Sequence, residues 1–82
     1  MTLKEFIEQF ESKMDVKDKL QYYNDKDSST NVIFFLDDNI MVSIGVFDDE
    51  SETAVFCIHK DKELLIADSM ILSNLIQCFG KV

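Results

Sequence analysis

The sequence contains no proline, no arginine and no tryptophan, and it has only two glycines, Gly45 and Gly80. No apolar run approaches the ~20 residues needed to cross a bilayer. Acidic residues near the N-terminus occupy the stretch where a signal peptide is apolar. Because all eight cations are lysines against 16 acidic residues, binding to nucleic acid or to an anionic membrane is disfavoured. We therefore expect a cytoplasmic protein that contacts neither membrane nor nucleic acid.

The 82 residues suffice for one domain, 1–82, with one core. The sequence is 46% hydrophobic with seven Phe, which indicates a packed interior and argues against disorder. Its two cysteines, Cys57 and Cys78, follow no spaced pattern. A small scaffold that is stabilised by disulfides normally has several of them, whereas two cysteines could form only one. We therefore expect both cysteines to be buried core residues instead.

Residues 2–14 are predicted to form a helix. Thr2 and Glu5 fit the T-x-x-E capping box. An apolar stripe follows at helical spacing: Leu3, Phe6, Ile7, Phe10 and Met14. Residues 15–24 are ambiguous, and the alternation of Leu20 and Tyr22 with polar neighbours suggests a short edge strand. Residues 25–30 are expected to be a loop.

Three strands are predicted at 31–36, 40–47 and 53–59, with short polar connections between them. Such connections require antiparallel neighbours. Strand alternation assigns one wholly apolar face: Val32, Phe34, Leu36, Ile40, Val42, Ile44, Val46, Ala54, Phe56 and Ile58. The opposite face is mixed: Ile33, Phe35, Met41, Ser43, Gly45, Phe47, Thr53, Val55, Cys57 and His59. This mixed face is either an interface or covered by one of the two helices.

Residues 64–67 are a candidate short strand, and a closing helix is expected from Asp68 or Ser69 to Phe79, with Gly80 at its C′ position. Leu72, Leu75, Ile76 and Phe79 form its expected buried stripe, widened by Ile71 and Cys78. No charged residue occurs from Ser69 to Gly80. The fold class predicted is α+β, a small antiparallel meander of three to five strands with a helix at each end.

The net charge of −8 is concentrated in one segment. Residues 25–52 contain eight acidic residues and only Lys26 as a cation: Asp25, Asp27, Asp37, Asp38, Asp48, Asp49, Glu50 and Glu52. In an up-and-down sheet alternate loops share an end, so the 25–30 and 48–52 loops should lie together. Carboxylates on such a rim can imitate backbone phosphates and attract a basic partner. Alternatively, the acidic loops only keep a small hydrophobic domain soluble.

Other chemistry has weaker support. A calcium loop starting at Asp25 would place Thr30 where glycine is needed and Leu36 where a bidentate glutamate is needed. Cys57 and His59 share a strand face, but the sequence offers no orienting acid or oxyanion donors. Two cysteines and one histidine do not complete a zinc site. We expect no catalysis, no metal and no cofactor.

The arrangement of an N-terminal amphipathic helix, a small antiparallel sheet, a closing helix and strong acidity resembles small phage-encoded inhibitors. These are the anti-CRISPR proteins that block the DNA-binding groove of Cas nucleases, and the acidic inhibitors of uracil-DNA glycosylase. The resemblance covers the whole chain in layout and charge. It implies a DNA mimic that inhibits a basic nucleic-acid-binding enzyme such as a Cas nuclease in the host cytoplasm. In this interpretation the eight acids of 25–52 bind the partner.

The uncharged closing helix and the mixed sheet face support a second hypothesis. In it the chain is a non-catalytic structural or regulatory module that forms a homodimer through one of these surfaces, and the acids serve only solubility.

Overall fold

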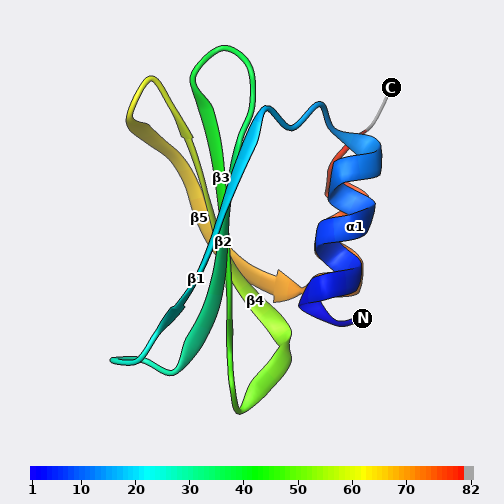
Figure 1. Ribbon diagram of the computed structural model, residues 1–82, viewed down its shortest axis with the longest axis vertical. Helices are drawn as coiled ribbons and strands as arrows, with labels where there is room; N and C mark the ends of the chain where they lie inside the picture. Colours follow the sequence, from blue (N-terminus) through cyan, green and yellow to red (C-terminus); the bar gives the residue numbers. More distant parts are fainter. Residues whose placement is uncertain (81–82) are drawn as a thin grey trace.

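The computed structural model describes residues 1–80. Its elements, in chain order, are α1 (Leu3–Lys13), β1 (Asp18–Asn24), β2 (Ser29–Phe35), β3 (Ile40–Phe47), β4 (Glu50–Lys60), β5 (Glu63–Ile71), α2 (Leu72–Leu75) and the 3-10 helix η1 (Ile76–Cys78). The strands form one sheet in the order β1-β2-β3-β4-β5, and every neighbouring pair is antiparallel (Figure 1). The predicted α+β class and meander are therefore confirmed.

Helix α1 begins with the capping box that the sequence predicts. The amide of Glu5 donates to Thr2 Oγ1 over 3.1 Å, and the amide of Thr2 donates to Glu5 Oε1 over 2.8 Å. These bonds satisfy amides that the helix itself leaves unpaired. The apolar stripe then buries Phe6, Ile7 and Phe10 against the sheet.

The strands are longer than the sequence patterns indicate. The ambiguous segment contains β1, which pairs with β2 at the edge of the sheet. Strand β2 begins at Ser29, inside the expected loop, and β4 begins at Glu50, so the β3–β4 turn is only Asp48–Asp49. The β2–β3 turn contains Asp38 and Asn39, with φ of 62° and 58°. Consecutive positive φ values are typical of tight hairpins whose twist matches that of the strands.

The prediction of a closing helix that starts at Asp68 or Ser69 is wrong. Residues 68–71 extend β5 and pair with residues 53–56 of the long strand β4. Strand pairing prevails because β4 offers a full ladder of hydrogen bonds, whereas a new helix must first order a turn for a single bond. Asp68 caps no helix. Its carboxylate accepts a hydrogen bond from the amide of Ser69 over 2.8 Å.

The end of the chain otherwise fits the predicted pattern. The stripe of Leu72, Leu75, Ile76 and Phe79 is buried. Gly80 has a φ of 70°, as expected beyond a helix end, and a side chain there would also collide with Lys13. The predicted widening of the stripe is wrong, because Ile71 and Cys78 are both exposed. Ile71 ends β5 on the face away from the helices, and Cys78 ends the 3-10 helix η1, whose buried residue is Ile76.

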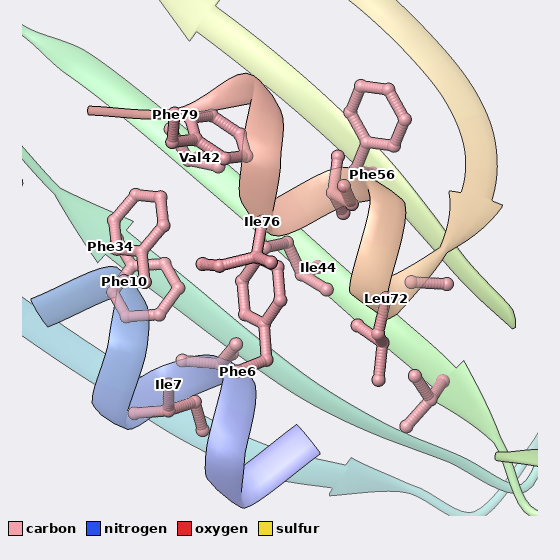
Figure 2. Close-up of a cluster of buried hydrophobic side chains, with 14 residues drawn as sticks. Phe6, Ile7, Phe10, Phe34, Val42, Ile44, Phe56, Leu72, Ile76 and Phe79 are labelled. Atoms are coloured by element: carbon pink, nitrogen blue, oxygen red, sulfur yellow. The ribbon is translucent and has the colours of Figure 1, made fainter. Parts of the chain in front are cut away.

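Both helical segments cover the same face of the sheet, since α2 and η1 lie behind α1 in Figure 1 and contact it. This face is the one predicted to be wholly apolar. Figure 2 shows its side chains meeting those of the helices in one core. The ring of Phe10 lies 4.0 Å from that of Phe34 and 5.0 Å from that of Phe79, measured between centroids. The alternative in which the two helices cover opposite faces is therefore wrong.

The cysteines are both free. Cys57 is half-buried on the mixed face and Cys78 is exposed, so the prediction that both belong to the core is wrong. The reason is that neither side chain points into the space between the sheet and the helices. None of the described helices has the length and apolar character needed to span a membrane.

Candidate functional site

Two hairpins bring acidic residues to one end of the sheet. The β1–β2 loop, 25–28, and the β3–β4 turn, 48–49, lie side by side at the lower end of Figure 1. The amide of Asp48 donates to the carbonyl of Ser28 over 2.9 Å. We call six residues here the acidic end: Asp25, Asp27, Asp48, Asp49, Glu50 and Glu52. The meander therefore places the two loops together as the sequence predicts.

The acidic end is exposed and carries little compensating charge. All six residues are exposed, and Lys26 is the one lysine in the two loops. The ion pairs among the described residues join Lys17 to Asp15 and Asp37, and Lys19 to Glu11. None of them reaches the acidic end, so its carboxylates present their full charge to the solvent.

A tyrosine connects the two hairpins. The hydroxyl of Tyr23, in β1, donates to Asp48 Oδ2 over 2.6 Å. This hydrogen bond is the largest cause of a raised pKa of Tyr23, and the negative charges of Asp48 and Asp25 raise it further. The phenol therefore stays protonated and can keep donating at any physiological pH. Nothing in the sequence pattern indicated this contact, which depends on the register of β1 against β2.

A second polar chain links the acidic end to the sheet. Ser29 is buried and its hydroxyl donates to Asp27 Oδ1. Asn31 in turn donates from Nδ2 to Ser29 Oγ over 2.9 Å. The side chain of Asn31 lies directly over Gly45 on the neighbouring strand, in space that any larger residue would occupy. The β1–β2 loop is thus held in place by Ser29 and Asn31, which both belong to strand β2.

Asp37 and Asp38 do not join the acidic end. They lie in the β2–β3 turn at the other end of the sheet, next to the β4–β5 turn. Asp37 Oδ2 lies 3.6 Å from Lys17 Nζ. Nearby, the amide of Asp61 donates to the carbonyl of Asn39 over 3.1 Å. The eight acids selected from the sequence therefore divide into six and two.

The mixed sheet face is left uncovered by every described element, and we call it the open face. Strand register arranges it in four rows across the sheet. The first three rows are Asp18, Phe35, Met41, His59 and Leu64; Leu20, Ile33, Ser43, Cys57 and Ala67; and Tyr22, Asn31, Gly45, Val55 and Ser69. The fourth row is interrupted by a register shift after Val46: Asn24, Ser29 and Phe47 lie in line with Glu50, and Thr53 pairs with Ile71.

Large apolar side chains on the open face are unusually exposed. Leu20, Tyr22, Val55, Leu64 and Ile71 are each between 43% and 56% exposed. The contributions of β1 and β5 were missed from the sequence, although the alternation of Leu20 and Tyr22 was the signal for the first. A shallow depression of about 120 Å³ lies in the two central rows, where Gly45 has no side chain. The open face is therefore largely apolar and exposed, with a shallow depression at its centre.

Within residues 1–80, the cysteine–histidine pair and the potential metal ligands remain separate. Cys57 and His59 share the open face as predicted, yet no hydrogen bond joins them within the described chain. Nδ1 of His59 is buried and has no hydrogen-bond partner there. No group of three potential metal-ligating side chains occurs in the described residues.

Comparisons of the chain with protein-family models, with curated proteins and with solved structures found no match.

Proposed function

We propose that this chain is a protein-binding inhibitor whose acidic end occupies the nucleic-acid-binding site of a basic protein. The observation that carries the proposal is the convergence of six carboxylates from two hairpins, joined by the contact between Tyr23 and Asp48. A sheet-supported cluster needs little ordering when it binds, which favours affinity.

The chemistry of the acidic end matches that of a phosphate backbone. DNA presents one negative charge per ~1.7 Å of its axis, and proteins recognise it by lysine and arginine side chains. Exposed carboxylates on adjacent loops offer acceptors of the same sign to those cations. A local excess of charge can also raise the association rate by roughly 10–1000-fold at low salt.

The resemblance to small acidic phage inhibitors supports a nucleic-acid-handling enzyme, such as a Cas nuclease, as the class of target. Asp48, Asp49 and Glu50 are placed at the centre of the contact because they lie on or beside the β3–β4 turn. We leave Asp37 and Asp38 outside the contact, since they lie at the far end of the sheet.

The proposal can be tested by affinity capture and competition. The tagged chain is used to capture partners from a bacterial lysate, and each captured protein is purified. The partner is then loaded with fluorescent duplex DNA, and the chain is titrated in while anisotropy is followed. We expect release of the DNA, with an affinity that falls steeply as salt is raised.

A matched pair of variants controls for overall charge. Asp48→Asn, Asp49→Asn and Glu50→Gln together neutralise the acidic end, whereas Asp37→Asn, Asp38→Asn and Asp61→Asn remove the same charge at the opposite end. The first triple variant should lose competition and the second should keep it. Equal behaviour of the two variants, or DNA that stays bound at saturating wild-type chain, would refute the proposal.

A further inference from the structure

We propose that the open face joins two copies of this chain into a symmetric dimer, with the acidic ends pointing to opposite poles. The proposal does not depend on the proposed function, because the open face and the acidic end are separate surfaces. Three features of the described residues lead to it: the distribution of charge, the size of the face and its shape.

The charge distribution selects the open face as the contact between two acidic copies. Charged residues make up 29% of the chain. The two central rows of the open face nevertheless contain none, and the acids of its outer rows are Asp18 at the edge of the sheet and Glu50. Glu50 lies at the β3–β4 turn, opposite Phe47. Two chains of charge −8 can therefore approach through this surface without bringing carboxylates together.

The size of the open face is sufficient for a stable interface. Five strands spaced ~4.8 Å apart and four rows of ~7 Å each cover roughly 670 Å² in projection. The accessible area of protruding side chains exceeds their projection, and so approaches the ~800 Å² that each partner contributes to a standard interface. A second sheet packed ~10 Å above this one would complete a sandwich of the common face-to-face kind.

The centre of the open face is hollowed. The depression at Gly45 is lined by Tyr22, Asn31 and Val55, among others. Val55 stands beside this depression with 43% of its surface exposed. In a two-fold interface the same patch meets itself, so the depression and the side chains around it face their own counterparts. A two-fold axis that runs across the strands between the two central rows places Val55 of each chain opposite Cys57 of its partner, which also lines the depression.

Electrostatics then selects the direction of the axis. An axis parallel to the strands would place the two acidic ends together, and their like charges would repel. An axis across the strands places them at opposite ends of the dimer. The dimer thus presents two acidic ends that point away from each other.

Sedimentation equilibrium tests the interface with one variant and its control. The wild type is expected to sediment at twice the monomer mass of 9.5 kDa, and Val55→Lys at the monomer mass. Ile66→Lys is the matched control, because Ile66 is similarly exposed at 46% but lies on the helix side of β5. It should remain a dimer. Circular dichroism verifies the fold, and Tyr22→Lys replaces Val55→Lys if that variant is unfolded.

Three outcomes overturn the proposal. They are a wild type that stays monomeric up to millimolar concentration, a folded Val55→Lys that still dimerises, and an Ile66→Lys that becomes monomeric. The last result would instead place the contact at the free edge of β5.

The direction of the axis is tested by pulsed electron spin resonance. A spin label is attached at Asp49→Cys in a chain that also carries Cys57→Ser and Cys78→Ser, after sedimentation shows that this chain dimerises. The described part of one subunit measures 33 × 24 × 20 Å. Labels at opposite poles should lie more than 24 Å apart, and a distance below 24 Å would contradict the proposed axis.

Discussion

The hydroxyl of Tyr23 donates to Asp48 Oδ2 over 2.6 Å and thereby joins two hairpins through residues that are 25 positions apart in the chain. One partner is an edge-strand phenol and the other is a carboxylate of the β3–β4 turn. The contact gives the acidic end a defined shape, because it holds the two loops at a fixed separation. It also raises the pKa of Tyr23, which can be measured directly.

We expect Tyr23 to ionise above its ordinary pKa near 10, because the Asp48 carboxylate accepts a hydrogen bond from the neutral phenol and repels the phenolate. A pKa raised by folding means that this contact stabilises the native state fully below pH ~10 and is lost as the pH rises through the raised value. Tyrosinate absorbance of the wild type should therefore show one delayed titration. Tyr23→Phe should remove that step, and a titration unchanged by this substitution would contradict the contact.

The close approach of Asn31 to Gly45 makes a second prediction. Gly45→Ala should destabilise the domain by about 1–3 kcal/mol, because the new methyl group displaces the side chain of Asn31 and its bonds to Ser29. Asn31→Ala in the same chain should recover part of the loss, since the collision is removed. Denaturant unfolding of the two single variants and the double variant measures the coupling. Additive effects would show that the two residues do not interact.

The aromatic contacts of Phe10 in the core make a third prediction. Phe10 is fully buried between Phe34 and Phe79, so Phe10→Ala should cost about 3–5 kcal/mol. A domain of this length has only roughly 4–12 kcal/mol of stability in total. Thermal unfolding should therefore show Phe10→Ala to be largely unfolded at 37 °C and Phe10→Leu to be folded but weakened. A fully stable Phe10→Ala would be incompatible with this core.

Thr2 and Asp68 both look like helix caps in the sequence, but replacing them should have different effects on stability. Thr2→Ala should cost about 1 kcal/mol, because it removes one half of the capping box of α1. Asp68→Ala should cost clearly less, because Asp68 is an exposed position of β5 and caps no helix. Chemical denaturation of both variants makes the comparison. A larger loss for Asp68→Ala would support the helix that the sequence predicts.

Local patterns predicted much of this fold because they reflect local physics. The capping box at Thr2, the apolar face of β2 to β4 and the left-handed residue Gly80 each depend on near neighbours or on strand alternation. The start of the closing helix could not be predicted in this way. It depends on how far β4 extends as a partner for β5, which is a property of residues 50–60 and their pairing.

The same distinction applies to the candidate surfaces. The meander alone was enough to bring the loops 25–28 and 48–49 together, and to separate them from Asp37 and Asp38. The contact of Tyr23 with Asp48 needs the register of β1, which no sequence pattern specified. The open face could be expected only as one of two alternatives, because periodicity assigns side chains to a face without showing which face the helices cover.

The central claim is that the acidic end competes with nucleic acid for a basic protein. The most direct measurement is the salt dependence of the chain's affinity for the captured partner, with the two charge-matched triple variants compared side by side. We predict that the logarithm of the affinity falls with the logarithm of salt concentration for the wild type and for the variant at 37, 38 and 61. We further predict that the slope is much reduced for the variant at 48, 49 and 50. Identical slopes for all three proteins would contradict the claim.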